Sequence, residues 1–566
     1  MAELLAVHFV ESAQRGERPV WHGPAASIAY DLEDVQARLQ RLGEPCYVVR
    51  NGKHNSAGGA AIGVSCEGDL VWNGAGTAPS VDAVRGTDAV LGTISAEALL
   101  FAPPLTRAQL GDAAFLQTYG LDCAYMGGSM ANGISSEAMV IALGQAGMLG
   151  AFGAGGLSPQ RLEEAIRRIQ AALPHGPYAF NLIHNPHEPA LESRAVELYL
   201  EHGVHVIEAS AFLALTPYVV RYRAAGLSRD DQGRVVIRNR IIAKVSRREV
   251  ARLFLQPAPE KLLTALVAQG TITAEQAALA AEVPMADDIT LEADSGGHTD
   301  NRPLVCLLPS IIALRDEIQA QSGYAEPVRI GAAGGIGTPV SALGAFMMGA
   351  AYVVTGSINH SCVEAGTSAH VKTMLSQADM ADVMMAPAAD MFELGVNLQV
   401  LKRGTMFPLR ARKLYELYQT YDSLDAIPAA ERGKLEKQIL RRPVDEVWDA
   451  CVAFFNDRDP QQVVKAQQNP KRKMGLVFRW YLGLATRWAI TGETGRELDY
   501  QVWCGPAMGA FNDWVRGSYL ADPAERYVAD VATKIMDGAA YLYRLQSLKM
   551  QGLRVPPSFA AVTPVL

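Results

Sequence analysis

Two glycine-rich turns in the chain are suited to binding an anion. The first lies within residues 331–337 and contains Gly334 and Gly335, and the second contains Gly356 and Ser357. Residues without a side chain let backbone N–H groups approach a phosphate closely. One such turn often marks only the close packing of a helix on a strand. Two of them at the ends of consecutive strands predict a phosphate site.

A histidine and a lysine are the side chains best suited to moving or balancing charge. His298 stands in a polar run flanked by glycines, and histidine transfers a proton near neutral pH. Lys244 ends the apolar run 241–245, where an unpaired ammonium group is costly. An electron-rich ring or a phosphate can balance its charge, and so can a carboxylate such as Glu208 or Glu292. His298 and Lys244 are the candidate catalytic residues.

Further candidates follow two other predicted strands. Asn181 ends one apolar run, and its amide can bind the polar edge of a ring system. Met126 and Gly127 follow another run and can form a shelf for the ring. Asp300 and Asn301 follow the histidine but have no assigned task.

Two kinds of site are not expected. His184 and His187 lie close together, but they lack a third ligand and an H-E-x-x-H pattern, so we expect no metal site. The sequence has no G-x-S-x-G nucleophile elbow, which counts against hydrolase or acyltransferase chemistry.

Eight short apolar runs alternate with helical patterns between residues 121 and 358. This alternation is typical of repeated β-α units, and eight units close a parallel barrel with its active site at the carboxyl ends of the strands. The helix that begins at Pro159 illustrates the pattern, because Ser158 can cap it. The fold class is therefore α/β, a (β/α)8 TIM barrel. The predicted strands are residues 122–126, 148–152, 178–182, 205–209, 241–245, 289–292, 328–332 and 352–355.

Three domains are expected. Residues 1–104 form a small strand-rich N-terminal subdomain, residues 105–375 form the barrel, and residues 376–566 form a helical C-terminal domain. The N-terminal strands are placed at residues 46–50, 60–64 and 69–72. Residues 246–287 contain two helical patterns, one of them with the capping box Thr273-x-x-Gln276. They are interpreted as a helical insertion that covers the mouth of the active site.

Composition limits the cellular location and the classes of binding partner that we expect. A net charge of −8 gives no global reason to bind nucleic acid or an anionic membrane. Seven cysteines without a C-x-x-C pair favour a reduced, cytoplasmic location. Residues 1–19 do not have the pattern of a signal peptide, and residues 138–156 are expected to be a buried helix and strand rather than a membrane span.

The longer motifs resemble one family. The run DSGGHTDNRPLVCLLPSIIALRD, followed by GAAGGIGTP and VTGSINHSCVEAGTS, is similar to the PfaD family of trans-acting enoyl reductases, within the nitronate monooxygenase (2-nitropropane dioxygenase) superfamily. Asp294-Ser295 departs from the usual Ala-Gly of the superfamily motif. The resemblance covers residues 105–548, including NPKRKM and WCGPAMGAFNDWVRGSYL, and it is loose at the N-terminus.

The resemblance implies an FMN-binding barrel with NADPH as hydride donor. The reaction implied is reduction of the α,β-double bond of an enoyl thioester carried by an acyl carrier protein domain of a polyketide or polyunsaturated fatty acid synthase. His298 is then placed beside the reactive face of the flavin. The residues implied to contact FMN are Met126, Gly127, Asn181, Lys244, Gly296, Gly297, Gly334, Gly335, Gly356 and Ser357.

Alternatives stay open at this point. One is an oxidative nitronate monooxygenase that uses His298 as base, and another is a non-catalytic flavin-binding assembly module. Malonyl transfer is a third, and the missing serine elbow counts against it. A carrier protein could dock on the basic residues Lys402, Arg403, Arg410, Arg412 and Lys413, or on Lys471, Arg472 and Lys473. Both groups could equally be solvated helix faces. No dinucleotide fingerprint is present, and the oligomeric state is left open.

Overall fold

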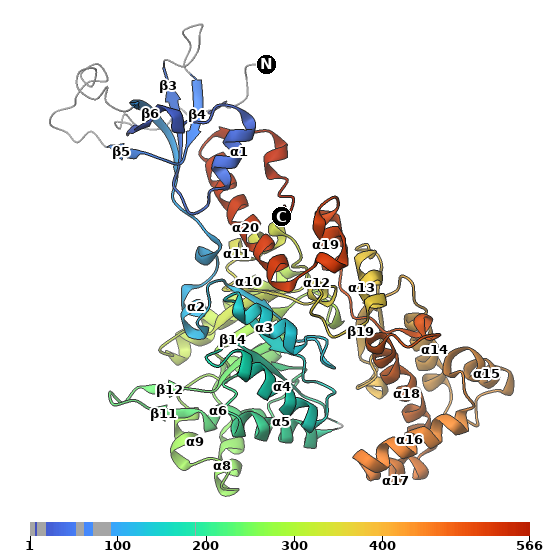
Figure 1. The fold of residues 1–566 in the computed structure, drawn as a ribbon. Helices are drawn as coiled ribbons and strands as arrows, with labels where there is room; N and C mark the ends of the chain where they lie inside the picture. Colours follow the sequence, from blue (N-terminus) through green and yellow to red (C-terminus); the bar gives the residue numbers. More distant parts are fainter. Residues whose placement is uncertain (1–5, 8–18, 53–60, 72–91, 187, 566) are drawn as a thin grey trace. The chain divides into compact units, whose positions relative to one another are not determined.

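The fold of the chain was obtained as a computed structural model (Figure 1). It describes residues 6–7, 19–52, 61–71, 92–186 and 188–565. These residues form two compact units. The smaller unit contains the chain up to residue 110 together with residues 342–344 and 533–564, and the larger contains residues 111–341 and 345–532.

All eight predicted barrel strands are present in the larger unit, where they close a parallel barrel. Parallel strands are buried on both faces and therefore read as continuous apolar runs, which is why they were recognisable in the sequence. The TIM-barrel prediction is confirmed. The strands are β7 (Tyr125–Gly127), β8 (Leu149–Phe152), β9 (Ala179–Ile183), β10 (Val206–Ser210), β13 (Arg240–Val245), β14 (Asp288–Glu292), β16 (Arg329–Ala333) and β17 (Val353–Thr355).

Helices connect the strands and begin where the sequence provides caps. The side chain of Ser158 accepts a hydrogen bond from the backbone N–H of Arg161 at 3.3 Å, which caps α4 as predicted. Residues 138–156 form most of α3 and all of β8, so the buried helix and strand are confirmed. The helices are α2 (Ala113–Tyr119), α3 (Glu137–Gln145), α4 (Pro159–Ala172), α5 (Pro189–Glu201), α6 (Pro217–Ala225), α10 (Leu304–Ser322), α11 (Pro339–Met347), α12 (Ser357–His360) and α13 (Ala369–Ser376).

Each helix in the described part of the chain is too short or too polar to cross a bilayer. All seven cysteines carry free thiols, and all but Cys306 are buried. Residues 1–5 and 8–18, on which the expectation about a signal peptide rests, lie outside the described residues.

A buried ion pair joins the first residues of β14 and β16. The guanidinium group of Arg329 donates from Nε to Oδ1 of Asp288 at 2.6 Å and from Nη2 to Oδ2 at 2.8 Å. The side chains are 5% and 0% exposed, respectively. Two parallel hydrogen bonds of this kind fix the relative position of the two strands at the end of the barrel opposite its mouth.

Replacing Arg329 by methionine is expected to lower the free energy of unfolding by about 3–5 kcal/mol, because the charge of Asp288 stays buried without its cation. Urea unfolding followed by circular dichroism measures the loss. The matched control is Arg234→Met, since Arg234 is 72% exposed and pairs with Asp230 on the surface. This control is expected to change stability little, and an equal loss in both variants contradicts the prediction.

The insertion lies at the mouth of the barrel only with its first residues, since Ser246, Arg247 and Val250 line the cavity there. It forms three helices, α7 (Arg248–Leu255), α8 (Glu260–Ala268) and α9 (Ala274–Ala280), and the predicted capping box of Thr273 and Gln276 is present. Helices α8 and α9 pack on α6 at the outside of the barrel, beside the strand pair β11 (Leu227–Arg229) and β12 (Val235–Ile237). Leucines of both helices are buried there, so α8 and α9 do not form the expected cover.

The chain beyond residue 376 is largely helical, as expected, but it also contains a strand hairpin that was not predicted. Strands β18 (Val383–Pro387) and β19 (Asn397–Leu401) pair antiparallel, and β15 (Gly297–His298) from the barrel joins them. The sheet therefore ties His298 to the C-terminal region. The helices that follow are α14 (Phe407–Thr420), α15 (Ala429–Lys434), α16 (Val444–Arg458), α17 (Pro460–Gln468), α18 (Pro470–Thr491) and α19 (Ala507–Val515).

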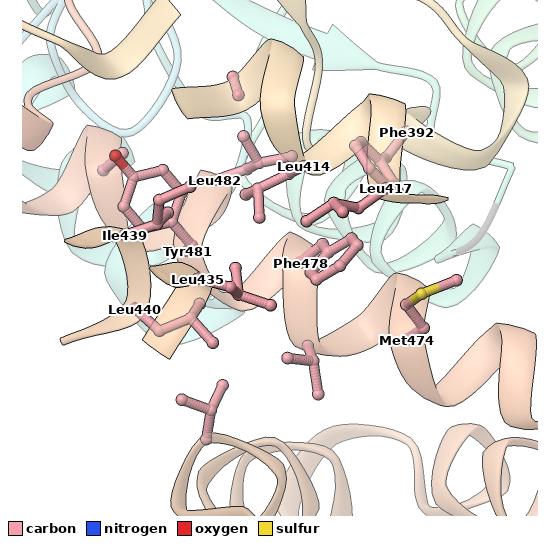
Figure 2. Packing of buried hydrophobic residues seen from close by; sticks show 14 of the residues in the cluster. Phe392, Leu414, Leu417, Leu435, Ile439, Leu440, Met474, Phe478, Tyr481 and Leu482 are labelled. Atoms are coloured by element: carbon pink, nitrogen blue, oxygen red, sulfur yellow. The ribbon is translucent and has the colours of Figure 1, made fainter. Parts of the chain in front are cut away.

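A hydrophobic cluster holds this hairpin to the helices (Figure 2). Phe392 lies between β18 and β19 and is fully buried. Its ring packs edge-on against Tyr418 of α14 at 5.2 Å and against Phe478 of α18 at 6.2 Å, measured between ring centroids. The connection between the two strands is therefore anchored by core packing rather than lying free on the surface.

The smaller unit is built on an antiparallel sheet. Its three predicted strands are present, although residues 60 and 72 lie outside the described residues. Residues 533–564 join this unit, so the expected 376–566 domain is divided between the two units. Arg544 helps to hold residues 533–564 in this unit, because its buried guanidinium group donates to the backbone carbonyls of Leu39, Leu42 and Glu44. The elements are β2 (Val20–Pro24), α1 (Leu32–Gln40), β3 (Cys46–Asn51), β4 (Ala61–Ser65), β5 (Asp69–Val71), β6 (Thr93–Ala102) and most of α20 (Val528–Met550).

Candidate active site

A cavity of about 920 Å³ opens at the carboxyl ends of the barrel strands. Its volume is near the upper end of the range for small-molecule sites, about 300–1,000 Å³. Most of the predicted site residues line it, although they come from six different strands and loops. The predicted residues in its lining are Asn181, Lys244, Gly296, Gly297, His298, Gly334, Gly335, Gly356 and Ser357.

Two predicted residues are not in the lining. The side chain of Met126 belongs to the hydrophobic core inside the barrel. A Cβ atom on Gly127 would lie 2.5 Å from Leu143 of α3, so this glycine serves helix-strand packing. The chain reaches the cavity immediately afterwards, at Gly128 and Ser129.

The two glycine turns meet at one side of the cavity, as the order of β16 and β17 in the barrel requires. Gly334 has a φ of +85°, and a Cβ atom there would lie 2.7 Å from the backbone of Ala293. A Cβ atom on Gly335 or Gly356 would meet nothing within 4 Å. Their backbones therefore face open space, which suits a phosphate group held by N–H donors.

Lys244 lies between two carboxylates at the base of the cavity. Its Nζ atom is 3.7 Å from Oε1 of Glu292 and 4.0 Å from Oε2 of Glu208. Burial favours the neutral amine, but the charges of Glu208 and Glu292 outweigh that effect and raise the pKa of Lys244. Both carboxylates that the sequence suggested as partners of Lys244 thus lie beside its ammonium group. Lys244 is therefore a cation that is held by two carboxylates and lines the cavity.

Glu208 is itself held from the other side. Its Oε2 atom accepts hydrogen bonds from the backbone N–H and the hydroxyl of Ser129. Burial raises the pKa of Glu292, although the cation of Lys244 opposes this. Two carboxylates and one ammonium group thus share the mouth of the barrel at the ends of β10, β13 and β14.

Asn181 has its donor group engaged within the protein. Its Nδ2 atom donates to the backbone carbonyl of Glu208 at 3.0 Å and to the hydroxyl of Ser210 at 2.8 Å. An amide nitrogen has two hydrogens, so both are used. The carbonyl oxygen of the amide is left as the group that can accept a hydrogen bond from a ligand.

His298 lies on β15 and pairs with a carboxylate that the sequence did not indicate. Its Nε2 atom is 3.2 Å from Oδ1 of Asp390, which stands in the connection between β18 and β19. Burial lowers the pKa of His298, but the hydrogen bond and charge of Asp390 outweigh it, with help from Glu292, and the pKa is raised. Asp390 is 92 residues away in the sequence, within a region expected to be helical, so no local pattern pointed to it.

The segment between α18 and α19 forms another wall of the cavity. A Cβ atom on Gly296 would lie 2.8 Å from the backbone nitrogen of Cys504, so only glycine allows this contact. The N–H of Gly505 donates to the hydroxyl of Ser357 at 2.9 Å. Gln501 and Trp503 line the cavity from the same segment. The mouth is therefore enclosed by the C-terminal region, which takes the place expected for the insertion.

Comparison with known proteins assigns the family. A family model described as nitronate monooxygenase matches residues 124–414, just over half of the chain. The chain belongs to the nitronate monooxygenase family. Among solved structures, it is 42% identical to the enoyl reductase domain of MlnA from the macrolactin biosynthesis cluster of Bacillus amyloliquefaciens, with a TM-score of 0.75. That match covers 78% of this chain and 99% of the MlnA domain.

Two further models and two curated relatives extend the likeness beyond the nitronate monooxygenase core. The N-terminal domain of fatty acid synthase subunit PfaD matches residues 21–84, and the inserted helical domain of [acyl-carrier-protein] S-malonyltransferase matches residues 421–500. The chain is 49% identical, over 94% of its length, to a polyunsaturated fatty acid synthase subunit of Thraustochytrium sp.. It is 46% identical, over 78% of its length, to polyketide biosynthesis protein PksE of Bacillus subtilis.

These comparisons confirm the resemblance to PfaD and extend it into the N-terminal region. The chain spans 34% of the length of the Thraustochytrium protein and 58% of the length of PksE. The malonyltransferase match is confined to helices α15–α18 and part of the chain on either side of them. No G-x-S-x-G elbow accompanies it in the sequence.

The other polar residues of this family member have structural partners. Asp300 binds Ser246 and Arg247, and Asn301 donates to Asp294 and to Gln399 of β19. These bonds fix the loop that carries His298. His184 is bound to Glu192 at 2.8 Å, while His187 lies outside the described residues. Within the described ranges, no group of three or more His, Cys, Asp or Glu side chains could hold a metal ion.

Many of the basic residues considered for docking are paired within the protein. Arg410 binds Asp499, and Lys413 lies near Glu416 and Glu431. Lys471 donates to two backbone carbonyls, and Lys473 lies over the ring of Trp448 at 5.1 Å. These pairs leave less free positive charge for docking at these positions. Lys402 and Arg403 are exposed, and Arg403 pairs with Asp382 at 3.3 Å.

Proposed function

We propose that this chain is an FMN-dependent enoyl reductase that reduces the α,β-double bond of carrier-bound enoyl thioesters with NADPH. One observation carries the proposal: a cavity that contains a paired, protonatable histidine, a buried lysine and two open glycine turns. The 42% sequence identity to the enoyl reductase domain of MlnA, in a match that covers 99% of that domain, supports the proposal. In this proposal the enzyme acts in trans on substrates that are bound to a polyketide or polyunsaturated fatty acid synthase.

The residues present fit FMN. Gly335 and Gly356 offer open backbone for the phosphate, and the amide oxygen of Asn181 can accept from the polar edge of the flavin ring. Lys244 offers a cation to an electron-rich ring. When bound, FMN supplies hydride transfer from NADPH to the β-carbon of the substrate.

Each protein group then has a definite task. The ammonium group of Lys244 favours binding of a ligand that carries negative charge, because it is held in place by Glu208 and Glu292 rather than by water. Protonated His298 donates a hydrogen bond and can give its proton to the α-carbon after the β-carbon has been reduced. The wall formed by Gln501 and Trp503 limits access of water to the mouth.

The proposal is tested first by the visible spectrum of the purified protein. We expect a flavin spectrum, with FMN as the released flavin, and bleaching when NADPH is added without oxygen. Adding crotonyl thioester anaerobically should then restore the colour and yield the saturated product. A colourless protein that cannot be reconstituted with FMN overturns the proposal.

The same experiment distinguishes oxidation of the reduced flavin by oxygen from the proposed reduction of an enoyl thioester. Return of colour only with oxygen, and none with the thioester, identifies an oxidase of the nitronate monooxygenase type. The non-catalytic assembly module is supported instead if thioester reduction in the complete synthase is unimpaired by the double substitution His298→Ala and Lys244→Ala.

A further inference from the structure

We propose that Asp390 is a positioning residue that binds Nε2–H of His298 and leaves Nδ1 as the ring nitrogen that meets the substrate. This role rests on the proposed function, because it assigns the proton donated to the α-carbon to one atom of the imidazole. It also assigns a task in the reaction to the hairpin of β18 and β19, which follows the barrel in the sequence.

The hydrogen bonds identify the two nitrogens. Nε2 of His298 lies 3.2 Å from Oδ1 of Asp390, and no described residue provides a hydrogen-bond partner for Nδ1. A carboxylate accepts only, so Nε2 carries the hydrogen of that pair. His298 lines the cavity, and Nδ1 is therefore the nitrogen available to a molecule inside it.

Both members of the pair are held by their surroundings. His298 is fixed by the pairing of β15 with β19, opposite Leu398. The backbone N–H of Met391 donates to the same Oδ1 atom of Asp390 at 3.0 Å. Two residues beyond Asp390, Phe392 is buried in the C-terminal hydrophobic cluster (Figure 2). The segment that carries the carboxylate is thus anchored by a packed core, and the carboxylate, 31% exposed, lines the cavity.

The charges around the ring favour its protonated form. The charged groups that face it are Asp390 from the hairpin, Glu292 from β14 and Lys244 from β13. Burial and Lys244 lower the pKa of His298, whereas the two carboxylates raise it, and the net direction is upward. Loss of Asp390 therefore lowers this pKa, so the imidazolium form is lost at a lower pH than in the native protein.

The test is a titration of His298 in the full-length protein. Histidine labelled with 13C at Cε1 is followed by NMR, and the signal of His298 is assigned by its absence in His298→Gln. We expect its pKa to fall in Asp390→Asn and to recover at least in part in Asp390→Glu. The control Asp382→Asn removes a carboxylate that stands just before β18 and pairs with Arg403, and it should leave the titration unchanged.

A kinetic measurement complements the titration. Thioester reduction by Asp390→Asn should fall about 10-fold or more at pH 8, and the loss should shrink as the pH is lowered, because more of the imidazole is then protonated in the variant. A pKa of His298 that is unchanged in Asp390→Asn overturns the inference, whatever reaction the protein catalyses. If the pKa of His298 falls in Asp390→Asn but the native protein reduces no thioester, the pairing of the two side chains is supported and the proposed function is wrong.

Discussion

Replacing His298 by glutamine is expected to slow thioester reduction about 10²–10⁴-fold at pH 7, the usual contribution of a general acid. Glutamine keeps a hydrogen-bonding side chain of similar length but has no proton to transfer. The half-reaction in which NADPH reduces the flavin should stay close to the native rate, because His298 has no task in it. Stopped-flow absorbance separates the two half-reactions.

The control for this variant is His205→Gln. His205 binds Asn239 just before β10, at the end of the barrel away from the mouth, so both half-reactions should be unchanged. The native enzyme should lose activity as the pH rises through the raised pKa of His298, because the proton donor is then lost. Native thioester reduction in His298→Gln rules out the histidine as proton donor.

Replacing Lys244 by methionine is expected to lower both the stability of the protein and its affinity for flavin. It leaves the buried Glu208 and the partly buried Glu292 near each other without the cation between them. Breaking a buried ion pair in this way costs about 3–5 kcal/mol. The loss should be smaller at pH 5 than at pH 8, because removal of the lysine raises the pKa of Glu292 further and protonation relieves the repulsion.

Thermal unfolding of the flavin-free protein at the two pH values measures this loss. The double variant Lys244→Met with Glu208→Gln should recover part of the stability, because one carboxylate charge has been removed with the cation. It should not recover flavin affinity, which depends on the lysine itself. Equal stability of the native protein and Lys244→Met would show that Lys244 does not balance the two carboxylates.

The chemistry of the mouth depends on regions far apart in the chain. The barrel supplies the glycine turns, Lys244 and His298, whereas the partner of the histidine comes from the β18–β19 connection. Gly296 can approach Cys504 closely only because it has no side chain. The helical C-terminal region is thus part of the active site and is more than an appended domain.

Local signals were enough to predict the barrel. Its strands are continuous apolar runs separated by capped helices, as at Ser158, and each such signal lies within a few residues of the sequence. The glycine turns, Lys244 and His298 were identified for the same reason, because they end or follow these runs. The fold class and nine of the residues that line the cavity therefore followed from the sequence alone.

Tertiary structure decided what depends on contacts between distant segments. Asp390 meets His298 across 92 residues, and no local pattern in the sequence shows that these two side chains pair. Helices α8 and α9 of the insertion pack on the outside of the barrel, where their leucines are buried, which their helical pattern did not reveal. Residues 533–564 join the N-terminal sheet through Arg544 and its buried hydrogen bonds. A periodic pattern reports that a face is buried, but not which distant segment buries it.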